Sequence, residues 1–118
     1  MGILSTRELI QAYYNAWANQ DRDSVRDLLA DDLDFRSAQD RFNQADEFLN
    51  ACWRFSDGIV GVNYLREIYS QDKAFVVLNW MYADGSCFID AEYLCISSEQ
   101  VCEILVVNNS PSFAEFAN

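Results

Sequence analysis

The chain has 118 residues, of which 51% are hydrophobic and 14% aromatic, and it carries a formal net charge of −11 at pH 7. This length and composition are typical of one packed domain, so we expect residues 1–118 to form a single domain with a C-terminal tail over residues 110–118. The excess of acidic side chains would repel phosphate groups, which argues against nucleic acid and an anionic membrane surface as partners.

The N-terminus has neither a basic region nor a long apolar stretch, and no window of the sequence is apolar enough for a membrane span. We therefore expect a cytoplasmic location. The chain contains no histidine, and its four cysteines, Cys52, Cys87, Cys95 and Cys102, form no C-x-x-C pair that would complete a zinc set. We interpret these cysteines as reduced, buried thiols and expect neither a metal nor a cofactor.

Two helices are predicted at the start of the chain. Ser5 and Glu8 form a capping box, and the apolar residues that follow recur at helical spacing, which predicts a first helix over residues 6–19. Asp21 can cap a second helix, which is short and ends near Ala30.

A strand and a third helix follow. Phe35 and Ser37 alternate with charged residues, which is the period of a short strand with one buried face, and residues 39–43 then form a polar loop. Asn43 can cap a third helix, which is expected to end at Gly58.

The second half of the chain is rich in Val, Ile, Tyr, Phe and Trp, which favour strands. Short turn-like separators indicate that neighbouring strands pair antiparallel. The predicted strands are residues 59–69, 73–82, 87–96 and 100–107. Helices first and strands last predict an α+β domain, in which three N-terminal helices pack on one face of a curved, mostly antiparallel sheet.

Three segments carry a resemblance to a known family. Residues 12–17 (AYYNAW), the corner at residues 20–21 and the run over residues 28–32 that leads to Phe35 resemble the nuclear-transport-factor-2-like superfamily, especially its SnoaL-like and ketosteroid-isomerase-like members. The resemblance covers essentially the whole chain. It implies a cone-shaped fold, in which a bent sheet wraps around the helices and leaves an apolar pocket, and a homodimer formed through the outer face of the sheet.

The catalytic positions of ketosteroid isomerase are only partly kept. The resemblance places the tyrosine of its oxyanion hole at Tyr13, its catalytic base at Ser37, and its protonated aspartate at Tyr93, close to Asp90. A serine hydroxyl without a neighbouring base cannot replace a carboxylate near neutral pH. Related dehydratases depend on histidine, which this chain lacks. We therefore expect no catalytic residues and no proton abstraction.

The expected pocket combines aromatic walls with a few uncharged polar groups, which suits a small, neutral hydrophobic or aromatic molecule. Its predicted residues are Tyr13, Ser37, Tyr93 and Asn108 as polar groups and Trp17, Phe35, Trp53 and Trp80 as apolar wall. Two alternatives stay open for the whole chain. One is an isomerase or cyclase of the same superfamily that uses Tyr13 and Tyr93, and the other is a dimeric interaction module whose cavity is filled by its own aromatic side chains.

Asp90 and Glu92 stand two residues apart, on one face of a predicted strand. Such a pair could serve acid–base chemistry or hold a metal. An alternation that buries Ile89, Ala91 and Tyr93 would direct both acids to solvent, so we expect Asp90 and Glu92 to be exposed.

Overall fold

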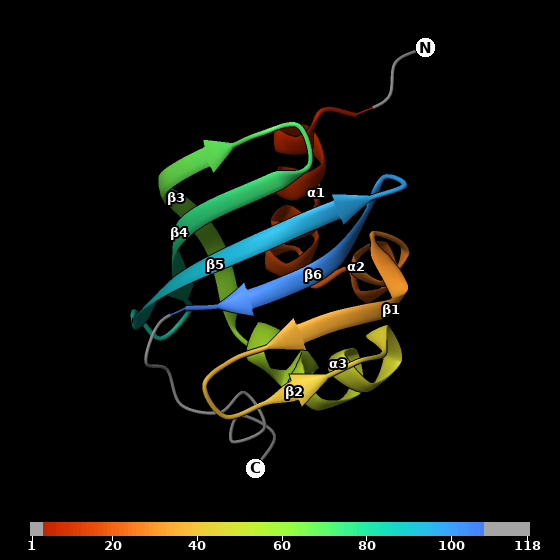
Figure 1. Ribbon diagram of the computed structural model, residues 1–118. Helices are drawn as coiled ribbons and strands as arrows, with labels where there is room; N and C mark the ends of the chain where they lie inside the picture. The colour runs from red at the N-terminus through yellow and green to blue at the C-terminus, as the bar shows by residue number, and fades with distance from the viewer. Residues whose placement is uncertain (1–3, 108–118) are drawn as a thin grey trace.

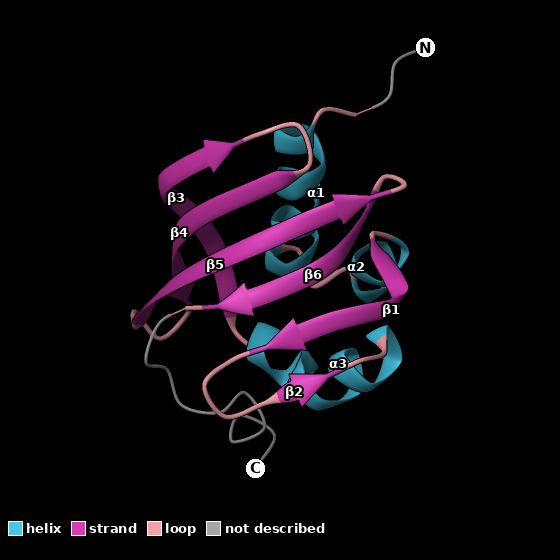
Figure 2. Ribbon diagram, viewed as in Figure 1, coloured by secondary structure: helices cyan, strands magenta, loops and turns pink. Residues whose placement is uncertain are grey.

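The structure, a computed structural model, describes residues 4–107. Three helices, α1 (Thr6–Ala18), α2 (Arg22–Asp27) and α3 (Ala45–Cys52), lie on one side of a six-stranded sheet (Figures 1 and 2), and a 3₁₀ turn (Trp53–Ser56) follows α3. The strands are β1 (Leu29–Arg36), β2 (Arg41–Phe42), β3 (Ile59–Tyr69), β4 (Lys73–Tyr82), β5 (Cys87–Ser97) and β6 (Gln100–Val106). The predicted α+β cone with a mostly antiparallel sheet is confirmed.

The strand order is β2-β1-β6-β5-β4-β3. Strands β3 to β6 form the predicted antiparallel meander, and β1 joins it parallel to β6. The register shifts within β3, at Ile59/Gly61 and Tyr64/Arg66, and between β5 and β6 at Cys95/Ile96. Such irregularities bend a strand and increase its twist, so they help the sheet to curve around α1.

The helix starts follow from local hydrogen bonds. Ser5 and Glu8 form the predicted capping box, in which the Glu8 N–H donates to Ser5 Oγ at 3.1 Å and the Ser5 N–H donates to Glu8 Oε1 at 2.9 Å. Asp21 caps α2 as predicted, because its side chain accepts the Ser24 N–H. Helix α2 ends at Asp27, before the predicted end, since the chain already enters β1 at Leu29.

The region predicted as a polar loop holds a short strand instead. In β2, Phe42 pairs with Phe35 of β1, and their ring centroids lie 5.8 Å apart. Gln44, rather than Asn43, takes the cap position of α3, and its side chain makes no capping hydrogen bond. Helix α3 therefore begins one residue later than predicted, directly after the segment that pairs with β1.

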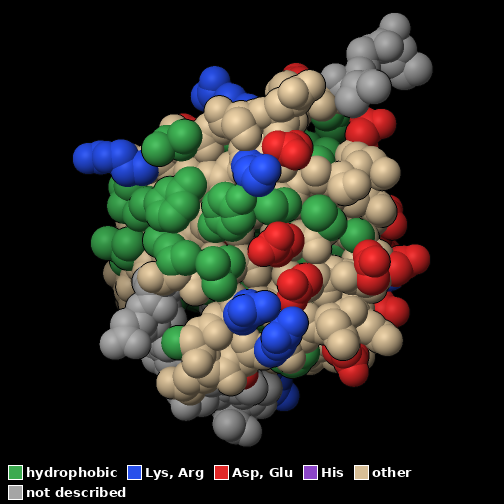
Figure 3. All heavy atoms as spheres, viewed as in Figure 1, with side chains coloured by type: hydrophobic (Ala, Val, Ile, Leu, Met, Phe, Trp, Pro, Cys, Tyr) green, Lys and Arg blue, Asp and Glu red, His purple; other side chains and the backbone are tan. Residues whose placement is uncertain are grey.

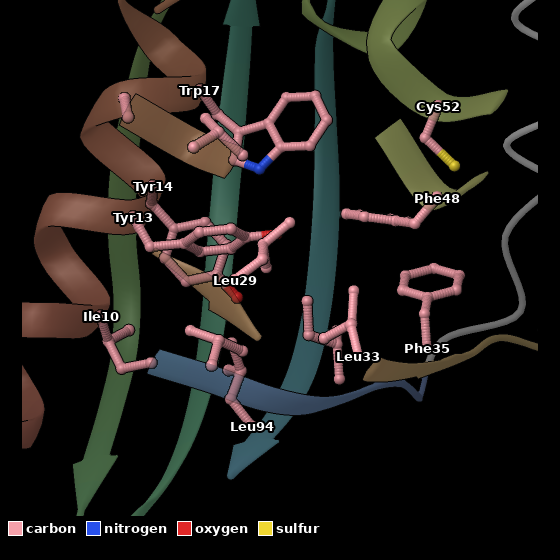
Figure 4. Close-up of a cluster of buried hydrophobic side chains, with 14 of the residues drawn as sticks. Ile10, Tyr13, Tyr14, Trp17, Leu29, Leu33, Phe35, Phe48, Cys52 and Leu94 are labelled. Carbon is pink, nitrogen blue, oxygen red and sulfur yellow. The ribbon is translucent and has the colours of Figure 1, made fainter. Parts of the chain in front are cut away.

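The core lies between the helices and the sheet. Helix α1 buries Leu9, Ile10, Tyr13, Tyr14 and Trp17, and Figure 4 shows the labelled α1 side chains pointing toward the strands. Among residues 4–107, no helix is long and apolar enough to cross a membrane.

All four cysteines are free thiols. Cys52 is buried, as predicted, whereas Cys95 and Cys102 are half-buried and Cys87 is exposed. The prediction of buried thiols is therefore wrong for Cys87, which is the first residue of β5, directly after the turn from β4. Burial raises the pKa of the Cys52 thiol to about 12, so this residue is an uncharged part of the core.

Candidate functional site

A small cavity lies between α1, α3 and the inner face of the sheet. Its volume is about 30 Å³, measured as the space open to the centre of a water molecule. That is room for about two water molecules. Seven aromatic side chains, one thiol and one carboxyl group line it: Tyr13, Tyr14, Trp17, Phe35, Phe48, Phe55, Trp80, Cys52 and Glu92. Figure 4 shows Tyr13, Tyr14 and Trp17 projecting from α1, opposite Phe35 and Phe48.

Strand β5 brings two acids to this interior. Asp90 is 1% exposed and Glu92 is 7% exposed, whereas Ile89 is 59% exposed. The prediction that Asp90 and Glu92 face solvent is therefore wrong. It failed because both faces of β5 carry apolar residues, so the alternation of hydrophobicity does not tell which face is inside.

Each buried acid has an identified hydrogen-bond donor. The Tyr14 hydroxyl donates to Glu92 Oε1 at 2.5 Å. The Trp80 indole N–H donates to Asp90 Oδ2 in a longer contact of 3.4 Å. The second oxygen of Asp90, Oδ1, is buried and accepts no hydrogen bond from any other group in the described part of the chain, which leaves it available for a proton carried by Glu92.

The pKa values of the two acids indicate that they share a proton. Burial raises the pKa of Glu92 well above its usual range, and the charge of Asp90 raises it further. Burial also raises the pKa of Asp90. The interaction between the two side chains raises the pKa of Glu92 and lowers the pKa of Asp90, so the pair retains a proton that two separate, exposed carboxyl groups would lose.

The two tyrosines of α1 are neutral donors. Burial, followed by the charge of Glu92, raises the pKa of both Tyr13 and Tyr14 well above the usual range. Their hydroxyl protons therefore stay in place near neutral pH. The site consists of hydroxyl groups and a shared-proton acid pair within an aromatic enclosure, and such an arrangement can donate hydrogen bonds, accept them, or transfer a proton.

Four of the predicted pocket residues meet at this cavity: Tyr13, Trp17, Phe35 and Trp80. Sequence reasoning missed the other five lining residues, Tyr14, Phe48, Cys52, Phe55 and Glu92, of which Tyr14 and Glu92 matter most for the chemistry. Tyr14 could have been found, because it shares the stripe of Ile10 and Trp17 on α1 at helical spacing. Glu92 carried no such signal, since nothing local shows that the acids of β5 face a tyrosine 78 residues away.

Three predicted residues lie elsewhere. Ser37 accepts the Asp40 N–H through its hydroxyl at 3.0 Å and stabilises the turn after β1. Trp53 packs behind Trp17, with ring centroids 4.7 Å apart, and does not line the cavity. Tyr93 lies on the outer face of β5, because side chains alternate along a strand and Asp90 and Glu92 occupy the inner face.

The fourth polar residue of the predicted pocket, Asn108, lies outside the described residues, as does the predicted tail over 110–118. Within residues 4–107, no group of three or more His, Cys, Asp or Glu side chains is arranged to hold a metal ion.

Comparison with known proteins places the fold. No family model matches the sequence, and no curated protein matches it significantly. Many solved structures match. One is a nuclear-transport-factor-2-like protein of unknown function from Burkholderia xenovorans, with a TM-score of 0.74 and 16% identity over 92% of this chain and 89% of that chain.

Two further solved structures represent the same architecture. A nuclear-transport-factor-2-like protein of unknown function from Cytophaga hutchinsonii has a TM-score of 0.69 and 10% identity, over 90% of this chain and 92% of that chain. An LEH-like epoxide hydrolase from M. tuberculosis has a TM-score of 0.68 and 16% identity, over 83% of this chain and 77% of that chain. This chain therefore has the nuclear-transport-factor-2-like fold, and the resemblance drawn from its sequence is confirmed at the level of the fold.

Proposed function

We propose that the interior cavity binds a small molecule, for which the pair Asp90 and Glu92 is the polar anchor and the aromatic side chains are the wall. One observation carries this proposal: Glu92 is 7% exposed, lines a mostly aromatic cavity, and is held at one oxygen by the Tyr14 hydroxyl. A largely apolar enclosure with a few convergent polar groups of perturbed pKa is the usual form of a ligand site.

Packing alone gives no reason for two buried acids. Desolvation of a carboxyl group lowers stability, and apolar residues of similar volume in place of buried charged groups are often neutral or stabilising. Asp90 and Glu92 are buried without a basic partner among the ion pairs of residues 4–107. We therefore infer that Asp90 and Glu92 have a functional role, because functional sites often lower the stability of a protein.

The size of the cavity limits the ligand. Space for about two water molecules admits a compound of a few non-hydrogen atoms, and a larger one would have to displace the side chains that line the cavity. The sequence predicted a small, neutral hydrophobic or aromatic ligand, and the cavity volume restricts this class to its smallest compounds. We expect the ligand to carry a group that forms a hydrogen bond with Glu92.

The test is a melting-temperature screen of small compounds against the wild-type chain, the Glu92→Gln variant and the Glu47→Gln variant. Glu47 is an exposed acid of α3, so Glu47→Gln makes the same substitution without touching the cavity. Compounds that raise the melting temperature of the wild type and of Glu47→Gln, but not of Glu92→Gln, would support the proposal. If no compound does so, the cavity is filled by its own side chains and the chain is better explained as an interaction module.

The acid pair also favours a second candidate function, proton transfer on a bound carbonyl compound. The pair of Asp90 and Glu92 puts an acid and a base close together, and Tyr13, which also lines the cavity, would keep the donor role that the sequence suggested for it, since the Tyr14 hydroxyl already donates to Glu92. An isomerase of this kind should exchange the α-hydrogens of a small ketone with deuterated water. Exchange at the same rate in wild type and in Glu92→Gln would exclude this function.

The outer face of the sheet supports a further proposal, a homodimer. Cross-strand register aligns a row of large apolar residues over four strands: Ile68, Phe75, Tyr93 and Leu105. Figure 3, viewed toward this face, shows hydrophobic side chains gathered over β3, β4 and β5. Ile68 is 67% exposed. Contiguous exposed apolar surface is typical of an interface.

Analytical ultracentrifugation tests the homodimer. The wild type should sediment with the mass of two chains, and Ile68→Lys should shift it toward one chain, because a charge within the apolar row would be desolvated in the interface. A wild-type protein that stays at the mass of one chain at high micromolar concentration would refute it.

A further inference from the structure

The cavity has the composition of an aromatic cage. Its rings come from both sides of the interior: Tyr14 lies 5.9 Å from Trp80, and Phe35 lies 4.6 Å from Phe48, between ring centroids. A cation within about 6 Å of a ring centroid is attracted by the negative face of the ring. An occupant of a cavity of about 30 Å³ lies against the rings that line it.

The interior also holds two acids without a basic partner. An acid pair that holds one proton keeps one negative charge. All eight Lys and Arg residues of the chain fall within residues 4–107, and none of the ion pairs recorded there involves Asp90 or Glu92. The donors that do reach the pair, Tyr14 and Trp80, are uncharged. The charge is therefore balanced only by hydrogen bonds.

We propose that the ligand of this cavity is a small ammonium cation, either ammonium itself or a short protonated amine, whose N–H groups donate to the carboxyl group of Glu92 while its remaining surface packs on the aromatic rings. This inference rests on the proposed small-molecule site and names the chemical class of its ligand. Methylammonium has two non-hydrogen atoms, which matches a space for about two water molecules.

The same composition disfavours metal cations and uncharged molecules. Hard metal cations take six or more oxygen ligands, and the cavity wall offers only the hydroxyls of Tyr13 and Tyr14 and the carboxyl group of Glu92. An uncharged molecule of the same size can donate a hydrogen bond to Glu92, but it gains neither the cation–π attraction of the rings nor the attraction between opposite charges. The net charge of −11 additionally concentrates cations around the chain.

The experiment measures the melting temperature and the tryptophan fluorescence of the full chain during titration with methylammonium chloride, at constant ionic strength. Sodium chloride controls for screening, and methanol is the uncharged probe of equal heavy-atom count. We expect a saturable rise in melting temperature and a fluorescence change with methylammonium alone, because Trp17 and Trp80 line the cavity.

Three variants locate the effect. Glu92→Gln should weaken methylammonium binding at least tenfold, and Glu47→Gln should leave it unchanged. Phe48→Leu, which removes one ring but no charge, should weaken binding severalfold. Circular dichroism shows whether each variant is folded, and Glu92→Asp, which keeps the carboxyl group, should retain part of the affinity if Glu92→Gln fails to fold.

The outcomes separate this inference from the proposal on which it rests. Equal shifts with sodium and methylammonium, or methylammonium binding that survives Glu92→Gln, would overturn the ammonium assignment. If methanol or another uncharged compound binds in a Glu92-dependent manner and methylammonium does not, the small-molecule site stands and the cation is wrong. If no probe binds at all, both proposals fall together.

Discussion

The two faces of β5 differ in a way that reverses the usual rule. The inner face carries Asp90 and Glu92 at 1% and 7% exposure, whereas Ile89 on the outer face is 59% exposed. Solvation alone would place these residues the other way round. The inner acids have partners on α1 and β4, and the outer row of apolar residues lies where a second chain could cover it. The proposed ligand site would account for the buried acids, and the proposed homodimer would account for the exposed apolar row.

The largest expected effect comes from the apolar neighbour of the acids. Leu94 is fully buried on the inner face, so Leu94→Ala should lower the free energy of unfolding by about 2–5 kcal/mol through lost packing and a cavity. Ile89→Ala, on the same strand, should change it by about 0.5 kcal/mol or less at low protein concentration. Urea unfolding measures both. A comparable loss at Ile89 would mean that the outer face is covered within the protomer.

The acid pair predicts an inverted pH dependence of stability. The folded-state pKa values of Glu92 and Asp90 are raised above 4.5 and 3.8, mainly by burial. For acids with raised pKa, the stabilising contribution is complete below the unfolded-state pKa and is lost as the pH rises through the folded-state pKa.

The reference for this measurement is the double variant Asp90→Asn/Glu92→Gln, which lacks both titrations. Above about pH 4.5, the unfolding free energy of the wild type should fall relative to that of the double variant as the pH rises. The expected slope is up to about 1.4 kcal/mol per pH unit for each proton that the folded chain holds and the unfolded chain does not. Urea unfolding at several pH values gives the difference. A difference that is constant or grows with pH would contradict the assignment of buried acids with raised pKa.

Two tyrosines provide a matched pair for the hydrogen bond to Glu92. The Tyr14 hydroxyl donates to Glu92, whereas the Tyr64 hydroxyl is buried without a hydrogen-bond partner in the described residues. Tyr14→Phe should lower the unfolding free energy by about 1–3 kcal/mol, because it leaves the Glu92 oxygen unpaired, and Tyr64→Phe should be nearly neutral. Equal effects at both positions would show that Glu92 gains nothing from Tyr14.

The smallest expected effect concerns Ser37, which the sequence analysis placed in the pocket but which lies outside the cavity in the structure. Ser37→Ala removes the hydroxyl that accepts the Asp40 N–H at 3.0 Å in the turn after β1. We expect a loss of about 0.5–1 kcal/mol in unfolding free energy and no change in ligand binding. A variant of Ser37 that binds the ligand of the cavity more weakly would return this residue to the site.

The aromatic part of the site could be predicted from the sequence, but its chemistry could not. Tyr13 and Trp17 recur at helical spacing on α1, so a local pattern places them on one buried face. The orientation of β5 is different, because apolar residues such as Ile89 and Leu94 lie on both sides of the strand and satisfy either register, and a shift by one residue moves every side chain to the other face. Glu92 faces the interior, where the Tyr14 hydroxyl donates a hydrogen bond to it, and this contact forms only in the folded chain.

The sequence by itself determined the order of the three helices and of every strand except β2, the capping box of α1 and the limits of β3 and β4, because these depend on hydrogen bonds and periodicities within a few residues. Only the tertiary structure decided the pairing of β1 with β6, the small volume of the cavity and the meeting of Tyr14 with Glu92. Those features depend on residues far apart in the chain, and the interactions between these residues form only when the sheet curves around α1.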